Sequence, residues 1–248
     1  LIYRSYYAFM GRPMRNRQGI NTSAVFGFTK FLRDILMKEA PRYMGVAFDP
    51  KGGTFRNELY PQYKANRNET PEDIVTAVPY IKRILEAMRI PCLEVPGYEA
   101  EDVIGTLARK AAGEGFEVYM VTPDKDFGQL IDRHVYIYKQ RRNGEGVEIV
   151  GCEQLREQYG ICLLYTSPSP IETDVPIAFV PEELVMEDPD CDALRDVYKE
   201  LDFGMFLREM EGTRTTPFTK AVKGTAPCSA PTKEDGPDSA PQGTDLPV

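Results

Sequence analysis

Residues 99–126, EAEDVIGTLARKAAGEGFEVYMVTPDKD, show the alternation on which the predicted fold rests. Residues 99–112 have the apolar spacing of an amphipathic helix, and two nearby glycines follow as stop signals. Residues 116–121 then form a short run typical of a β-strand, which ends just before Asp124 and Asp126. A helix followed by a strand that leads into acidic residues is typical of α/β proteins, whose ligands bind at the carboxyl ends of parallel strands.

The same alternation extends toward the amino terminus. Helices are predicted over residues 21–40 and 70–88, and Pro79 predicts a kink or a break in the second of them. Residues 43–49 form a continuous apolar run that ends in Asp49, as a buried parallel strand does. Together these elements predict an α/β fold with a mostly parallel sheet flanked by helices.

Downstream of Asp126 the pattern predicts a change to antiparallel pairing. Residues 134–139 and 147–150 are two short strand-like runs on either side of the turn dipeptide at residues 143–144. An Asn-Gly dipeptide between such runs favours a β-hairpin. A helix is then predicted over residues 153–159.

The carboxyl-terminal third has a different texture. Residues 162–170 fit neither a helix nor a strand and are interpreted as an aberrant junction. Residues 171–212 are predicted to be an inter-domain segment, with a helix capped by Asp188 and Pro189. Residues 213–248 are rich in Pro, Gly, Ser, Thr and Ala, which predicts a disordered linker.

Charge is unevenly distributed along the chain. The formal net charge is −8, but residues 1–161 carry a net +2 and the acidity lies in residues 162–248. The first 67 residues hold 12 basic and 4 acidic side chains. Such a basic region suits a partner that carries phosphates, and a solvated basic face is the alternative interpretation.

Cysteine content and hydropathy exclude several classes of protein. The five cysteines form no CxxC pair, so the sequence predicts neither a zinc site nor a disulfide framework and favours a reducing compartment. No apolar run approaches the roughly 18 residues of a membrane span, so no membrane association is predicted.

Carboxylates are predicted to gather where the parallel strands end. Six of them lie at a strand end or at the start of the helix that faces it, namely Asp49, Glu99, Glu101, Asp102, Asp124 and Asp126. Divalent cations commonly neutralise such clusters, and oxygen ligands without nearby His or Cys favour Mg²⁺ or Mn²⁺. The pattern predicts metal-assisted phosphoryl chemistry. The alternatives are an acidic first turn that complements the helix dipole, and solvated loops.

A basic and aromatic stretch lies between the predicted strand and helix on either side of residue 60, and comprises Phe55, Arg56, Tyr60, Tyr63, Lys64 and Arg67. Cations interleaved with aromatic rings can bind a phosphate backbone and stack on bases. A basic loop that happens to contain aromatic residues is the alternative. An acidic centre inside a basic rim is the charge distribution expected of a metal-dependent nuclease.

Several motifs occur in one order along residues 1–161: YRSYYAF at 3–9, FDPKGGTFRNELY at 48–60, YKANR at 63–67, GYEAEDVIGTLA at 97–108 and DKDFGQL at 124–130. In this order they resemble the amino-terminal 5′-nuclease domain of bacterial DNA polymerase I, a relative of the flap endonucleases. The resemblance implies a PIN-like, resolvase-like α/β fold and two-metal hydrolysis of DNA phosphodiester bonds.

The resemblance also implies roles for individual residues. The ligands of a first Mg²⁺ or Mn²⁺ ion would be Asp49, Glu99, Glu101 and Asp102, and those of a second would be Asp124 and Asp126. Catalytic steering of the phosphate is implied for Arg4, Lys64 and Arg67. Nucleic-acid binding is implied for Arg4, Arg56, Tyr63, Lys64 and Arg67.

The chain departs from the family pattern in three places. An opening strand with a metal-binding aspartate is expected before Leu1, and a GD-x-x-D-N segment with a helix-three-turn-helix is expected after Ile161. Glu101 stands where Asp is usual. An incomplete ligand set is expected to weaken the second metal most, so that residual activity needs Mn²⁺ at high concentration.

The implied function is a 5′-3′ exonuclease and structure-specific 5′-flap endonuclease in replication and repair. The expected partners are DNA with 5′ flaps, nicks or single-stranded ends, RNA primers, and a polymerase module in the intact parent protein. A monomer in the bacterial cytoplasm, associated with the nucleoid, is expected. The alternatives are a catalytically impaired DNA-binding fragment of the same domain and another Mg²⁺-dependent phosphohydrolase on a PIN-like fold.

Overall fold

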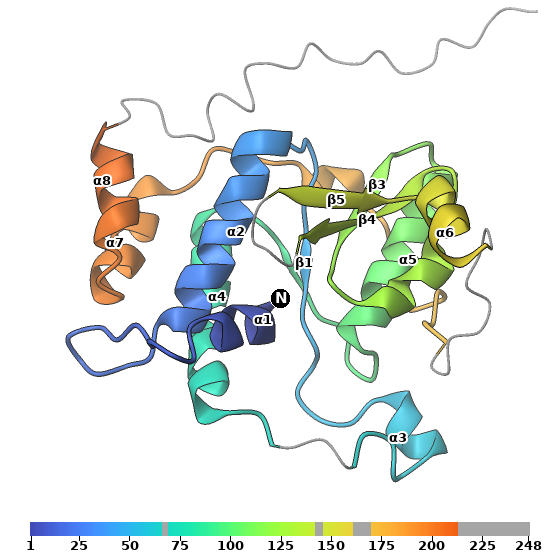
Figure 1. Ribbon diagram of the computed structural model, residues 1–248, viewed down its shortest axis with the longest axis horizontal. Coiled ribbons are helices and arrows are strands. Elements are labelled where there is room, and N and C mark those ends of the chain that lie inside the picture. The colour runs from blue at the N-terminus through green and yellow to red at the C-terminus, as the bar shows by residue number, and fades with distance from the viewer. Residues whose placement is uncertain (66–68, 142–145, 161–169, 213–248) are drawn as a thin grey trace, which may run out of the picture.

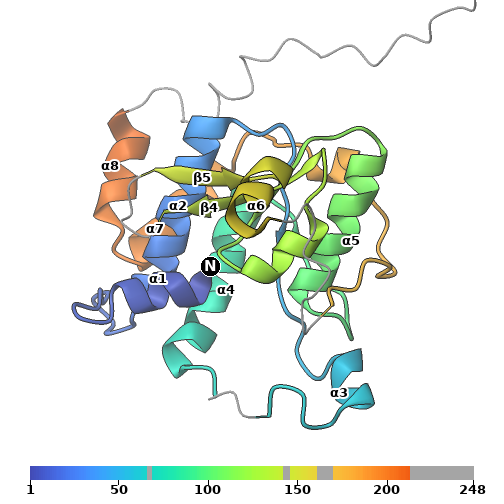
Figure 2. The same ribbon diagram turned by 45° about the vertical axis from the view of Figure 1, so that its right-hand side comes forward.

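The computed structural model describes residues 1–65, 69–141, 146–160 and 170–212. Helices and short strands alternate along this part of the chain, and the strands lie between two groups of helices (Figure 1). One group comprises α2 (Ser23–Glu39), α4 (Glu72–Ala87), α7 (Cys191–Glu200) and α8 (Gly204–Gly212). The other comprises α5 (Ala100–Gly113) and α6 (Cys152–Tyr159), as the turned view also shows (Figure 2).

Helices α2 and α4 pack together at the centre of the larger core. Their apolar stripes bury Val25 and Phe28 on α2, and Ile81 and Leu85 on α4, which confirms both helices predicted from apolar spacing. The predicted break at Pro79 does not occur, because α4 continues through this residue as one helix. Burial of its apolar face stabilises the helix against the local preference of proline.

The described strands form two separate sheets. β1 (Val46–Ala47) pairs in parallel with β2 (Cys92–Leu93). β3 (Val118–Val121) pairs in parallel with β4 (Val135–Gln140), and β4 pairs antiparallel with β5 (Val147–Val150). The predicted mostly parallel pairing and the predicted hairpin are therefore confirmed, although the turn of the hairpin lies outside the described residues.

Strand β1 is much shorter than the predicted run of residues 43–49. The backbone N–H of Met44 donates to the carbonyl of Leu184 at 2.8 Å. Tyr43 forms an isolated antiparallel bridge with Val185. The first part of the apolar run therefore pairs with a distant segment of the chain, and the short 3₁₀ helix η2 (Pro181–Leu184) ends at this contact.

A smaller core forms where α5 and α6 pack near the three-stranded sheet. The 3₁₀ helix η1 (Lys125–Leu130) belongs to it and buries Phe127 and Leu130. Helix α5 begins one residue after Glu99, which confirms the predicted helix at residues 99–112. Strand β3, which pairs with β4 in the sheet, ends shortly before Asp124.

Two short helices were not predicted from the sequence pattern. Helix α1 (Ile2–Ala8) packs on α2, and its Ile2 and Tyr6 side chains contact the larger core. Helix α3 (Phe55–Leu59) begins with a capping box between Thr54 and Asn57 and projects away from the rest of the domain (Figure 1).

The segment of residues 171–212 is part of the same folded body as the helices before it. Its helices α7 and α8 pack against α4 and α2, and six of its side chains are buried in the larger core: Leu194, Val197, Tyr198, Leu201, Phe203 and Phe206. The predicted inter-domain segment thus completes the core in the structure. Residues 161–169, which include most of the predicted junction, and the predicted linker at 213–248 lie outside the described residues.

The start of α7 differs from the predicted cap at Asp188 and Pro189. The Asp190 side chain accepts hydrogen bonds from the backbone of Asp192 and Ala193 at 3.1 and 2.9 Å. Asp190 is therefore the N-cap, because its carboxylate reaches the free N–H groups of the first turn.

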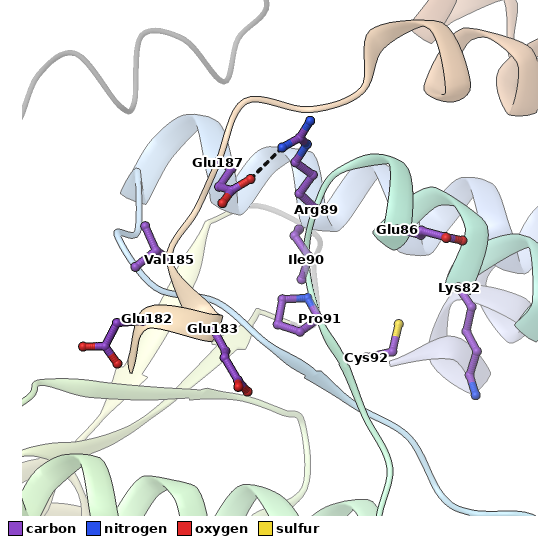
Figure 3. A pocket seen from close by; sticks show the side chains of 10 residues that line it. All are labelled: Lys82, Glu86, Arg89, Ile90, Pro91, Cys92, Glu182, Glu183, Val185 and Glu187. Carbon is purple, nitrogen blue, oxygen red and sulfur yellow. Dashed lines mark hydrogen bonds and ion pairs between the residues drawn. The ribbon is translucent and has the colours of Figure 1, made fainter. Parts of the chain in front are cut away.

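A surface pocket lies between the end of α4 and the segment around η2 (Figure 3). Its lining is mixed in charge, and Arg89 forms an ion pair with Glu187 at 2.7 Å across one side. Cys92, the first residue of β2, lines the pocket, and none of the predicted site residues does. No helix in the described part of the chain is both long enough and apolar enough to span a bilayer.

Candidate functional site

The amino terminus of α5 is the centre of the candidate site. Glu99 and Asp102 form its capping box, in which the Glu99 N–H donates to Asp102 Oδ2 at 3.0 Å. The N–H of Ala100 donates to Asp49 Oδ1 at 2.8 Å. Because Asp49 follows β1, this contact brings the end of the strand against the start of the helix, as the sequence predicts for a parallel α/β arrangement.

Asp102 is completely engaged within the protein. Its two carboxylate oxygens accept from Arg56 Nη1 and Nη2 at 2.6 and 2.7 Å. The N–H of Glu172 also donates to Asp102 Oδ1 at 2.9 Å. The side chain of Asp102 is 0% exposed and that of Arg56 is 10% exposed. Arg56, which was expected to contact nucleic acid, and Asp102, which was expected to bind a metal, are thus each other's partners in the structure.

Glu99 lies beside this buried pair and contacts two further side chains, Lys64 and Tyr63. Its Oε1 lies 2.6 Å from Lys64 Nζ, and its Oε2 lies 3.3 Å from the Tyr63 hydroxyl. Arg56 Nη1 is 3.6 Å from Glu99 Oε2. Burial lowers the pKa of Lys64, but the hydrogen bond and the charge of Glu99 outweigh burial, so the net pKa is raised. Lys64 therefore remains a cation beside the carboxylates.

Glu101 is the carboxylate most perturbed by its surroundings. Burial, together with its hydrogen bond to Glu99 and the charge of Glu99, raises the pKa of Glu101 to about 7. The donor set of Asp49, Glu99 and Glu101 contains only oxygen atoms, which fits Mg²⁺ or Mn²⁺.

Asp124 and Asp126 form a second acidic position at the end of β3. Asp124 caps η1, since its Oδ1 accepts from the N–H of Asp126 at 3.0 Å. The Thr122 hydroxyl accepts from the N–H of Asp124 at 3.1 Å. Within the described ranges no group of three or more His, Cys, Asp or Glu side chains is arranged to hold a metal ion. The six predicted carboxylates therefore do not form one compact cluster.

The predicted basic residues lie in different surroundings. Lys64 has a positive φ of 58° and projects from the loop after α3 onto Glu99. Arg4 donates to the carbonyls of Gln140 and Arg141 at 3.3 Å, so α1 is tied to the end of β4. Arg67 lies outside the described residues.

Sequence reasoning missed the contribution of residues 170–175. In addition to the Glu172 contact with Asp102, the carbonyl of Pro170 accepts from Arg56 Nη2 at 2.8 Å. These are contacts of backbone atoms, which every residue type carries, so no sequence signal identifies them. Only their nearness in the fold reveals that this segment reaches the candidate site.

The amino acid sequence of this chain matches a known protein family. The profile of the 5′-3′ exonuclease N-terminal resolvase-like domain matches residues 1–160. The chain belongs to this family. The match covers the Asp49 strand end, the acidic start of α5 and the acidic end of β3. Residues 1–160, here called the exonuclease-family domain, therefore contain each position at which carboxylates were predicted.

Curated relatives of the exonuclease-family domain are longer proteins. DNA polymerase I of Bacillus caldotenax is 42% identical over 158 residues, which are 63% of this chain and 18% of the polymerase. The 5′-3′ exonuclease of Aquifex aeolicus is 36% identical over 160 residues, which are 64% of this chain and 53% of the exonuclease. The chain therefore spans only part of the length of the curated relatives it matches.

Solved structures support the fold of the exonuclease-family domain. The phage T5 D15 protein, co-crystallized with metal ions, aligns with a TM-score of 0.50 and 15% identity. The alignment covers 65% of this chain and 58% of the T5 protein. This likeness confirms the predicted PIN-like, resolvase-like α/β architecture.

Proposed function

We propose that the exonuclease-family domain is a metal-dependent 5′-3′ exonuclease and 5′-flap endonuclease of a DNA polymerase I. The observation that carries this proposal is the contact of Asp49, at the end of β1, with the first turn of α5, whose capping residue Glu99 is paired with the cation of Lys64. Carboxylates that can hold a divalent cation, next to a lysine that can hold a phosphate, suit hydrolysis of a phosphodiester bond.

Asp49, Glu99 and Glu101 would hold the first divalent cation, and Asp124 with Asp126 the second. When bound, such cations lower the pKa of an attacking water and stabilise charge on the leaving oxygen. The exposed position of Asp124 on η1 leaves its carboxylate accessible from solvent. We propose that the second cation is the weaker of the two, and that the choice between Mg²⁺ and Mn²⁺ depends on it.

The basic residues would bind the substrate. Glu99 holds Lys64 in place, and the Lys64 side chain remains 27% exposed. Its ammonium group can therefore bind a phosphate without leaving the site. Tyr63 lies beside it and can stack on a base. Arg4 and Arg67 would bind the phosphate backbone further along. Arg56 would act indirectly, because its guanidinium already binds Asp102 and Pro170.

The proposed substrates are DNA with 5′ flaps, nicks or single-stranded ends, and RNA primers annealed to DNA. The parent protein would carry a polymerase module, as the relatives named DNA polymerase I suggest. We propose that the parent protein acts as a monomer in the bacterial cytoplasm, associated with the nucleoid.

A cleavage assay on a 5′-labelled flap duplex tests the proposal. We expect cleavage in Mn²⁺ that is abolished by EDTA and reduced at least tenfold in Asp124→Ala. Asp188→Ala is a matched control, because Asp188 lies far along the chain from the acidic positions and touches none of the proposed ligands. Equal cleavage with and without EDTA would contradict the proposal.

Two other outcomes of the same assay would support the alternative functions. Salt-sensitive binding of flap DNA without cleavage would indicate a DNA-binding fragment that has lost catalysis. Turnover of a small phosphomonoester with no cleavage of flap DNA would indicate a different phosphohydrolase on this fold.

A further inference from the structure

The segment of residues 170–175, here called the strap, closes the hydrogen-bonding network behind the candidate site. It passes beside α5 (Figure 2). The carbonyl of Pro170 accepts from Arg56 Nη2, and the N–H of Glu172 donates to Asp102 Oδ1. One side of the Arg56–Asp102 pair is thus satisfied by the strap. Buried charges that lack such partners are costly, so the strap stabilises this arrangement.

The pair in turn holds Glu99. Asp102 Oδ2 accepts from the Glu99 N–H at 3.0 Å, and Arg56 Nη1 lies 3.6 Å from Glu99 Oε2. Glu99 and its neighbour Glu101 are two of the proposed ligands. A movement of Asp102 would therefore reach both through the first turn of α5.

The strap is anchored by two further backbone contacts. The N–H of Ile171 donates to Gln129 Oε1 at 3.0 Å, and the N–H of Val175 donates to Thr106 Oγ1 at 3.1 Å. Thr106 is fully buried on α5 and Gln129 lies on η1. The strap therefore ties together the two elements whose starts carry the acidic positions.

Packing holds the strap close to α5. Ile171 is 7% exposed and belongs to the smaller core. A Cβ atom at Gly105 would lie 2.8 Å from Ile171 Cγ2 and 3.1 Å from Leu130 Cδ1. The strap can approach α5 this closely only because residue 105 has no side chain.

We propose that the strap is a positioning element of the carboxylate site, which orients Glu99 and Glu101 through the Arg56–Asp102 pair. Its relevance to metal binding rests on the proposed function. The strap touches neither of the two ligand carboxylates in the contacts described above, so its effect is indirect. Residues that orient ligands in this way commonly change metal affinity by about 10- to 100-fold when they are altered.

Gly105→Ala tests the proposal by displacing the strap. Gly113→Ala is the matched control, because it lies on the same helix and a Cβ there meets nothing within 4 Å. The first readout is amide exchange of Glu99 and Ala100 in the absence of metal, resolved by residue. We expect at least threefold faster exchange in Gly105→Ala and no change in Gly113→Ala. The second readout is Mn²⁺ affinity by calorimetry, expected to fall about tenfold in Gly105→Ala only.

A second substitution makes the test specific to the strap. Ile171→Ala removes the Cγ2 atom that the new methyl group would meet at 2.8 Å, and the Leu130 Cδ1 atom at 3.1 Å is the end of a flexible side chain that can turn aside. The double variant Gly105→Ala, Ile171→Ala is therefore expected to restore both readouts. Thr106→Val removes the acceptor of the Val175 N–H with almost no change in shape. If thermal unfolding shows that Gly105→Ala does not fold, Thr106→Val is the variant that tests the strap.

The outcomes separate the strap from the proposed function. Unchanged exchange in Gly105→Ala and Thr106→Val, or a loss that Ile171→Ala does not restore, would overturn the strap proposal even where the wild type binds Mn²⁺. Faster exchange that is restored by Ile171→Ala, in a protein that binds no Mn²⁺, would support the strap and contradict the proposed function.

Discussion

Arg56 on α3 forms a two-point ion pair with Asp102 on α5, although 46 positions separate the two residues in the sequence. The hydrogen bond to Asp102 is the main cause of the raised pKa of Arg56, so the guanidinium stays charged. Helix α3 has only five residues and could not persist alone. The pair therefore fixes a short projecting element to the start of the helix that carries the candidate site.

Loss of one partner of this pair is expected to be strongly destabilising. Arg56→Ala would leave the buried Asp102 carboxylate without its cation, so the free energy of unfolding should fall by about 3–5 kcal/mol. Arg56→Lys should be intermediate, because an ammonium keeps the charge but cannot bind both oxygens. Urea unfolding measures the difference. The control Lys30→Ala breaks the exposed pair with Asp34 and should change stability by at most about 0.5 kcal/mol.

Packing of the carboxyl-terminal helices can be tested at Phe206. Its ring is 1% exposed, lies 5.2 Å from the ring of Phe26 and stacks under the Arg33 guanidinium at 4.8 Å. Phe206→Ala should lower the free energy of unfolding by about 3–5 kcal/mol. We expect a single unfolding transition that shifts as a whole. An earlier, separate transition for α7 and α8 would show that they form a unit of their own.

Tyr198 predicts a specific effect of alkaline pH on stability. Its buried hydroxyl lies near Arg33 but has no hydrogen-bond partner of acceptable geometry among the described residues. Burial raises the pKa of Tyr198 to about 12, from an unperturbed value of 10.0. The pKa of Tyr198 is higher in the folded state than in the unfolded state. Its contribution to the free energy of unfolding is therefore fully present below pH 10 and is lost as pH rises toward 12.

Tyr198→Phe removes this titrating group. At pH 7 the variant should be as stable as the wild type or slightly more stable, because an unsatisfied polar atom is removed. Between pH 7 and 11 the wild type should lose about 1 kcal/mol relative to the variant. Denaturant unfolding of both proteins at the two pH values measures this. A difference that does not change with pH would contradict the raised pKa.

Lys64 is expected to affect DNA more than stability. Lys64→Ala should lower flap cleavage at least tenfold, and the slope of log affinity against log salt should weaken by about 0.9 for one lost phosphate contact. Its free energy of unfolding should fall by less than in Arg56→Ala, because Glu99 keeps Arg56 and the Tyr63 hydroxyl as partners. Lys82→Ala, which breaks a similar pair with Glu94, is the control and should leave DNA binding unchanged.

The metal requirement gives a further prediction. We expect residual cleavage to need Mn²⁺ at high concentration, because only two carboxylates, Asp124 and Asp126, are proposed to hold the second cation. Titration of Mg²⁺ and Mn²⁺ in the flap assay measures it. Equal turnover in low Mg²⁺ and in high Mn²⁺ would show that the second cation is bound tightly.

Local patterning predicted most of the elements in this domain. The helices α2, α4 and α5 follow from apolar spacing, and the hairpin of β4 and β5 follows from two short runs around a turn dipeptide. The place of Asp49 beside the start of α5 also follows, because the carboxyl end of a parallel strand faces the next helix. The helices and the hairpin depend on neighbours within a few residues, which a sequence displays directly, and the place of Asp49 follows from the general topology of parallel α/β folds.

The tertiary structure alone decided which charges meet. Arg56 binds Asp102 rather than facing solvent, and residues 170–175 close the network through backbone N–H and carbonyl groups. Likewise, Met44, just before β1, pairs with Leu184, far along the chain. Such contacts join positions that are distant in sequence and often use atoms common to every residue. The sequence therefore determined the elements and the placing of the acidic motifs, whereas the fold decided their partners, because long-range packing and backbone hydrogen bonds leave no local pattern.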